Sequence, residues 1–141
     1  MEAYLDNSAT TRCFEAVKDI VVKTMTEDYG NPSAMHQKGV EAENYVKEAV
    51  ARIARTLKVQ EKEIYFTSGG TESDNWALAG TAYAHCRQGK HSITTVFEHA
   101  AVSAPLAALE EQGYEITKIP VDKNGNFSME KLEKAIRPDT I

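Results

Sequence analysis

A glycine-containing segment in the middle of the chain has the residue types that bind an anion. Ser68-Gly69-Gly70-Thr71 follows a short β-favouring run and precedes an alanine-rich stretch, which predicts a strand, a tight turn and a helix. Glycines allow close approach to the backbone, and the free N–H groups and dipole of a helix N-terminus favour a negative charge. Hydroxyl groups at Ser68, Thr71 and Ser73 add donors, so phosphate binding is the chemistry expected here.

The same segment also fits an ordinary strand-to-helix turn, in which glycine serves the turn geometry and Ser or Thr caps the helix. It lacks the lysine of G-x-x-x-x-G-K-[ST] and the spacing of G-x-G-x-x-G. The two usual nucleotide-binding interpretations therefore fail. From this segment alone, phosphate binding and a purely structural turn remain equally open.

A second candidate is His99, which follows a strand predicted over residues 91–96. Parallel sheets present functional side chains at their carboxyl edge, and a histidine there could stack on an aromatic cofactor and transfer protons near neutral pH. The alternative is a polar loop residue at a strand end. Cys13 and Cys86 lie far apart, in neither a C-x-x-C pair nor a Cys/His cluster, so no metal site or disulfide is expected.

The elements that must position these residues follow from the hydrophobic periodicity. Apolar residues recur at helical spacing in two N-terminal segments, and strands alternate with helices thereafter. This order predicts an α/β fold with a mostly parallel sheet flanked by helices. The expected helices are 13–27, 38–57, 75–86, 100–111 and 128–136, and the expected strands are 64–67, 91–96 and 114–121.

Composition excludes several classes of protein. The 141 residues are 42% hydrophobic with a formal net charge of -5, and the basic residues are scattered, so we expect a folded, soluble protein that does not bind nucleic acid. No stretch of about 18 apolar residues is present, and the N-terminus has no secretory signal. We therefore expect no membrane association and a cytoplasmic location.

Four segments taken together resemble the N-terminal motifs of pyridoxal-phosphate-dependent cysteine desulfurases, in the same order. They are Tyr4-Leu5-Asp6-Asn7-Ser8-Ala9-Thr10-Thr11, Tyr29-Gly30-Asn31-Pro32-Ser33, Phe66-Thr67-Ser68-Gly69-Gly70-Thr71-Glu72-Ser73 and Glu98-His99-Ala100-Ala101-Val102. The third and fourth are closest to the nitrogenase-type and iron-sulfur-assembly-type branch. The resemblance implies part of the large domain of a fold-type-I enzyme, within the class-V aminotransferase group.

That resemblance implies sulfur transfer from L-cysteine, which leaves L-alanine, to an acceptor or scaffold protein for iron-sulfur cluster or thio-cofactor synthesis. Carried over to this chain, Gly70 and Thr71 would hold the phosphate of pyridoxal 5'-phosphate, and His99 would stack on its ring and assist proton transfer. Asn7, Ala9 and Thr10 would lie near the substrate. Family members are homodimers, so a homodimer or other self-association is expected.

The resemblance also implies a division into an arm, helix and turn over residues 1–35 and an incomplete cofactor-binding domain over residues 36–141. Asp139-Thr140-Ile141 looks like the start of another strand, so the chain is expected to stop inside a domain. In the family, the cofactor-binding lysine, the aspartate that pairs with the ring nitrogen and the sulfur-accepting cysteine lie further downstream. The lysines present, such as Lys47, Lys62 and Lys118, are expected on the surface.

The isolated chain is therefore expected to be inactive. Two alternatives stay open. One is part of another class-V aminotransferase-type enzyme that uses pyridoxal phosphate, such as a selenocysteine lyase. The other is a non-catalytic protein that dimerises or binds a phosphate-bearing ligand.

Overall fold

A computed structural model describes residues 3–8 and 10–141. The chain forms two compact units, residues 1–65 and residues 66–141. The predicted division into residues 1–35 and 36–141 refers to the domains of a longer protein, which these two units do not test, and it stays a prediction.

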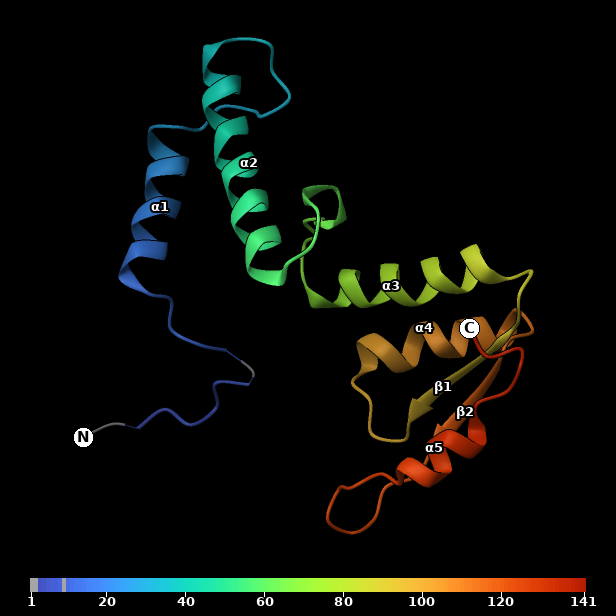
Figure 1. The fold of residues 1–141 in the computed structure, drawn as a ribbon. Coiled ribbons are helices and arrows are strands. Elements are labelled where there is room, and N and C mark those ends of the chain that lie inside the picture. Colours follow the sequence, from blue (N-terminus) through green and yellow to red (C-terminus); the bar gives the residue numbers. More distant parts are fainter. Residues whose placement is uncertain (1–2, 9) are drawn as a thin grey trace. The chain divides into compact units, whose positions relative to one another are not determined.

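The first unit is helical. It contains α1 (Glu15–Thr26), α2 (Gln37–Leu57) and the short 3-10 helix η1 (Glu61–Glu63), which confirms both predicted helices. In Figure 1, α1 and α2 run in opposite directions. Tyr45 on α2 links them, because its hydroxyl donates to Asp28 Oδ2 at 2.6 Å and accepts from Lys23 Nζ at 3.0 Å.

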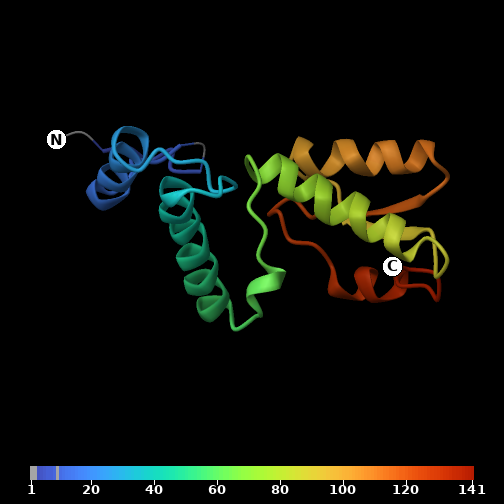
Figure 2. The same cartoon turned by 90° about the horizontal axis from the view of Figure 1, so that it is seen from above.

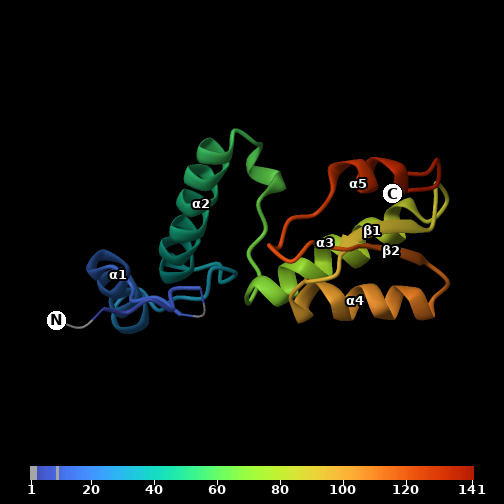
Figure 3. The same cartoon turned by 90° about the horizontal axis from the view of Figure 1, so that it is seen from below.

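The second unit is an α/β layer, as predicted. It contains α3 (Gly70–His85), β1 (His91–Thr95), α4 (Ala100–Glu111), β2 (Glu115–Ile119) and α5 (Met129–Ala135). The two strands are parallel and in register from His91 opposite Glu115 to Thr95 opposite Ile119. Helices α4 and α5 lie on opposite sides of the strands in Figures 1, 2 and 3, and α3 packs beside α4.

The core of this unit lies between α3, α4 and β2. Its buried members are Ala82, Leu106, Leu109 and Tyr114. The Tyr114 hydroxyl donates to the Ala82 carbonyl at 2.9 Å, which satisfies a polar atom inside an apolar cluster. Among the helices that the structure describes, none is long and apolar enough to cross a membrane.

The last residues of the chain pair with β1. Thr140 forms a parallel bridge with His91, and the Ile141 N–H donates to the His91 carbonyl at 2.9 Å, as expected for the start of a strand. The His91 side chain is fully buried, and its two ring nitrogens bond the hydroxyls of Thr140 and Thr117 at 2.7 Å each. This histidine therefore joins β1 to β2 and to the C-terminal residues.

Two elements differ most from the prediction, and the other boundaries shift by one or two residues. Residues 64–67 form no ladder with any described residue, so the predicted strand is wrong, and Tyr65 and Phe66 are exposed. A β-favouring run needs a neighbouring strand to supply its hydrogen bonds, and no described segment lies beside it as a strand. Helix α3 begins at Gly70 rather than at residue 75, because Gly69 already serves as its N-cap.

Gly89 offers a direct test of how the C-terminal residues pack. A Cβ at this position would lie 1.9 Å from the Asp139 carbonyl oxygen, whereas a Cβ at Gly80 inside α3 would meet nothing within 4 Å. We expect Gly89→Ala to lower the free energy of unfolding by about 1–3 kcal/mol. The control Gly80→Ala should raise it by about 0.5–1 kcal/mol, since alanine favours a helix. Urea unfolding followed by circular dichroism measures both, and equal stabilities would contradict the packing.

Arg137 makes the same region sensitive to acid. Its guanidinium donates to Glu115 at 2.7 Å and to Asp139 at 3.1 Å, and these bonds hold the pKa of each carboxyl below its ordinary value of 4.5 or 3.8. A carboxyl whose pKa is lowered by folding adds stability above its unfolded pKa and loses that stability as the pH falls through its folded pKa.

We therefore expect unfolding to become easier as the pH falls below about 4.5, and Arg137→Gln to make this dependence shallower. The control is Arg87→Gln, at an exposed arginine with no ion pair among the described residues. Urea midpoints measured from neutral to acid pH provide the readout. Identical slopes for the two variants would show that the Arg137 contacts add nothing.

Candidate functional site

The turn before α3 contains two glycines that the chain itself does not require. Gly69 has a φ of 165°, an extended conformation that any residue adopts, and Gly70 is the first helical residue. A Cβ added to either one would meet nothing within 4 Å. Turn geometry and internal packing therefore fail to explain these glycines. Their remaining physical use is close approach by a group from outside the described residues.

The backbone in front of this open space offers hydrogen-bond donors. The N–H groups of Gly70, Thr71 and Glu72 belong to the first turn of α3 and find no acceptor among the residues described. The positive end of a 16-residue helix lies at the same point. An anion is the group that this arrangement favours.

The side chains of the turn are used differently from the prediction. Ser68 Oγ donates to Glu72 Oε2 at 2.7 Å, and Ser73 Oγ shares a hydrogen bond of 2.7 Å with Thr67 Oγ1. Both serine hydroxyls, expected to be donors for the anion, therefore have partners within the turn. Only the hydroxyl of Thr71, among the three expected, has no partner in the described part of the chain.

Glu72 is a functional candidate that sequence reasoning missed. Its Oε2 also accepts from the Ser68 backbone N–H at 2.7 Å, and these two bonds from Ser68 lower the pKa of the carboxyl below its usual value. A helix capping box spaces its residues by three, and here the spacing is four, so the usual motif does not detect the pair. The sequence feature that could have indicated this pair is a carboxylate in the first helical turn after a Ser-Gly-Gly sequence.

His99 is the N-cap of α4, and its ring is fixed by the helix that follows. The Ala101 N–H donates to His99 Nδ1 at 3.0 Å. Because Nδ1 accepts, the proton of the neutral ring lies on Nε2, and the exposed side chain can offer Nε2–H as a donor. Thr95 Oγ1 donates to Glu98 Oε1 at 2.5 Å and ties the preceding loop to the end of β1.

The fold brings Gly70, Thr71 and His99 to one edge of the second unit. The strands end, and both α3 and α4 begin, on the same side in Figures 1, 2 and 3. This is the carboxyl edge of the parallel pair, where α/β proteins place their ligands. The predicted phosphate donors and the predicted ring-stacking histidine therefore share an edge.

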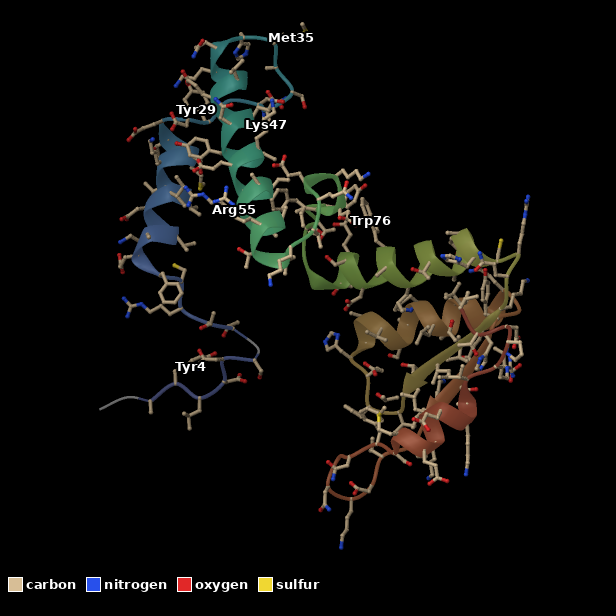
Figure 4. The ribbon with its side chains drawn as sticks, viewed as in Figure 1. Tyr4, Tyr29, Met35, Lys47, Arg55 and Trp76 are labelled. Atoms are coloured by element: carbon tan, nitrogen blue, oxygen red, sulfur yellow. The ribbon has the colours of Figure 1, made fainter. Side chains whose placement is uncertain are left out.

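The predicted substrate-proximal residues lie in the first unit. Asn7 Oδ1 accepts from Thr11 Oγ1 at 2.9 Å, and Thr10 Oγ1 bonds the Tyr4 hydroxyl at 2.5 Å. These side chains line an open hollow, and Figure 4 labels Tyr4 within this arm. Ala9 lies outside the described residues. The role of all three near the substrate stays a prediction.

The described residues give little support for a metal site or for chemistry at a cysteine or lysine. No group of three or more His, Cys, Asp or Glu side chains is placed to hold a metal ion within residues 3–8 and 10–141. Cys13 and Cys86 are free, exposed thiols. Lys47 bonds Glu43 at 2.8 Å on an exposed helix face, as expected for a surface lysine, and Figure 4 shows its place on α2.

Comparison with curated proteins shows close relatives. The chain is 49% identical over 138 residues to cysteine desulfurase IscS of Methanosarcina thermophila, a match that covers 98% of this chain and 34% of that protein. It is 44% identical over 140 residues to cysteine desulfurase IscS of Dictyoglomus turgidum, covering 99% of this chain and 36% of that protein. The chain thus spans about a third of the length of these relatives.

Solved structures agree on the fold. A NifS-like protein matches with a TM-score of 0.92 and 38% identity, covering 99% of this chain and 38% of that one. DndA from Streptomyces lividans matches with a TM-score of 0.83 and 39% identity, covering 99% and 39%. The family model for class-V aminotransferases matches residues 3–141. The chain belongs to the class-V aminotransferase family.

Proposed function

We propose that this chain is the N-terminal, cofactor-binding part of a cysteine desulfurase. The observation that carries the proposal is the pair of glycines at 69 and 70, which nothing in the described chain requires, in front of free N–H groups. The relatives named cysteine desulfurase support the reaction, and a matching structure described as SspA in complex with cysteine supports L-cysteine as substrate.

The residues present fit pyridoxal 5'-phosphate. The N–H groups of Gly70 and Thr71 and the hydroxyl of Thr71 would hold its phosphate at the start of α3. His99 would lie against its ring, with Nε2 as the nitrogen that carries and transfers a proton. When bound, the cofactor supplies an electron sink for breaking bonds at the carbons of the amino acid.

The other half of the reaction is assigned to groups outside these residues. The cofactor-binding lysine, the partner of the ring nitrogen and the sulfur-accepting cysteine are proposed to lie outside these residues, as the resemblance implies. Asn7, Ala9 and Thr10 are proposed to lie near the substrate, and the sulfur is proposed to pass to an acceptor protein for iron-sulfur cluster or thio-cofactor synthesis.

We also propose that the chain works as a homodimer in the cytoplasm. Helix α1 has no buried residue, and its large apolar residues, including Ile20, Val21, Val22 and Met25, are at least 41% exposed. Trp76 is 57% exposed and projects from α3 on the side away from α4 in Figure 4. Large apolar side chains that lie exposed on one helix are typical of a surface that packs against another protein segment.

Gly70→Ala tests the phosphate site without disturbing the fold. The added methyl meets no atom of the chain, so stability should stay the same or rise slightly. Affinity for pyridoxal 5'-phosphate, measured by isothermal titration calorimetry, should fall about tenfold, which corresponds to about 1.4 kcal/mol, because the methyl enters the space of the ligand.

Gly80→Ala is the matched control, since it adds a methyl to the same helix, also into open space, but away from the first turn. It should leave the affinity unchanged. Equal affinities for the Gly70→Ala variant and the unchanged chain would mean that the ligand does not bind close to residue 70.

The activity of the chain by itself is a separate test. With pyridoxal 5'-phosphate and L-cysteine, we expect the 141 residues to release neither alanine nor sulfide, because the lysine and cysteine of the reaction are assigned elsewhere. Adding the remaining portion of a desulfurase should restore alanine formation. Alanine above background from the chain alone would contradict this assignment. Restoration of an aminotransferase reaction instead would favour another class-V enzyme.

A further inference from the structure

We propose that Glu72 is a positioning residue for the phosphate site. Its side chain holds the turn in place and occupies the donors of Ser68, so that the anion binds the donors of Gly70 and Thr71. This inference rests on the proposed function, because it needs the start of α3 to bind a phosphate group. The side chain of Glu72 would touch neither the phosphate nor the substrate.

The geometry of the Glu72 carboxylate supports this role. Its Oε2 accepts from both the backbone N–H and the hydroxyl of Ser68, at 2.7 Å each. Glu72 lies in the first turn of α3, so its side chain reaches back across Gly69 and Gly70 and closes the turn on itself. The two donors of Ser68 are thereby withdrawn from any ligand.

A second set of contacts holds the neighbouring residue. The Gly69 carbonyl accepts from Thr67 Oγ1 at 3.1 Å and from the Ser73 N–H at 3.1 Å. Ser68 and Gly69 are thus both tied to residues of the turn or of α3. The turn is therefore already ordered in the absence of a ligand, so the free energy of binding is not reduced by the cost of ordering the turn.

The charge of Glu72 cannot be what favours the ligand. The hydrogen bonds from Ser68 lower the pKa of Glu72, so the carboxylate is ionised at neutral pH. A negative charge in the first helical turn repels a phosphate, although it stabilises the helix. The benefit for binding must therefore come from the position of the acceptor oxygen. Glutamine keeps one such oxygen and removes the charge.

Two substitutions separate these contributions. Glu72→Ala removes the acceptor, so pyridoxal 5'-phosphate and inorganic phosphate should bind about five- to tenfold more weakly, because the turn must then be ordered on binding. Glu72→Gln keeps an oxygen for both Ser68 donors, so its affinity should equal or exceed that of the unchanged chain. Stability to urea, measured in parallel, should fall in both variants, since both lose the charge at the helix start.

Backbone amide resonances of the 15N-labelled chain give the second readout. When inorganic phosphate or pyridoxal 5'-phosphate is added, the amides of Gly70 and Thr71 should shift and the Ser68 amide should not. Without ligand, the Ser68 amide should be protected from hydrogen exchange in the unchanged chain and in Glu72→Gln, and should lose protection in Glu72→Ala.

Glu63→Ala is the matched control. Glu63 also accepts a backbone N–H in a short turn, from Gln60 at 2.7 Å, but it has no part in the proposed site. Its replacement should leave phosphate affinity and the Ser68 amide unchanged. An effect equal to that of Glu72→Ala would reduce the role of Glu72 to general stability and overturn the proposal.

The remaining outcomes also decide the matter. If neither ligand shifts any amide of residues 68–73, the phosphate site itself is wrong, and the role of Glu72 falls with it. If Gly70 and Thr71 respond but Glu72→Ala binds as tightly as the unchanged chain, only the role of Glu72 is wrong. The same holds if Glu72→Gln binds as weakly as Glu72→Ala, or if the Ser68 amide itself responds to phosphate.

Discussion

Two parallel strands cannot be joined by a short turn, and this constraint arranges residues 66–141. The chain must cross from the end of β1 to the start of β2, and α4 makes that crossing. The start of α4 therefore lies at the carboxyl edge of the strands, with His99 as its cap. Helix α3 runs beside α4 and begins on the same side, so the Ser-Gly-Gly-Thr turn reaches this edge as well. The position of the candidate site therefore follows from the direction of the two strands.

At that edge, the chain separates the groups that build the turn from those left for a ligand. Hydroxyl, carboxylate and carbonyl groups of Thr67, Ser68, Gly69, Glu72 and Ser73 bond one another. The first N–H groups of α3 find no acceptor among the described residues, and the Cβ positions of Gly69 and Gly70 beside them are open. His99 shows the same division: its Nδ1 accepts from the Ala101 N–H of the helix, and its Nε2 has no hydrogen-bond partner among the described residues. The polar groups that build the turn thus have hydrogen-bond partners within the chain, and the groups without such partners are available to a ligand.

The opposite end of the strands serves stability. His91 is fully buried and bonds Thr117 and Thr140, while Arg137 holds Glu115 and Asp139. Gly89 allows the Asp139 backbone to approach closely. These contacts attach the C-terminal residues to β1 and leave the carboxyl edge free. The candidate binding groups and the stabilising groups therefore occupy different ends of the same two strands.

The sequence alone determined most of the elements and the identity of the candidate site. Helical periodicity marks α1 and α2, and α4 ends at Glu111, as predicted, shortly before Gly113 with its positive φ of 85°. Four ordered motifs indicated the family. These features are local, so neighbouring residues suffice to specify them.

Only the tertiary structure decided what depends on partners. Residues 64–67 have β-favouring side chains but no described strand beside them, so propensity alone gave the wrong element. The sequence left the glycines at 69 and 70 open between a structural turn and a ligand site, and the empty space around their Cβ positions shows that packing among the described residues does not require them. Glu72 bonds Ser68 at a spacing that no capping motif covers. Contacts of this kind depend on how the backbone is placed in space, which residue types alone do not specify.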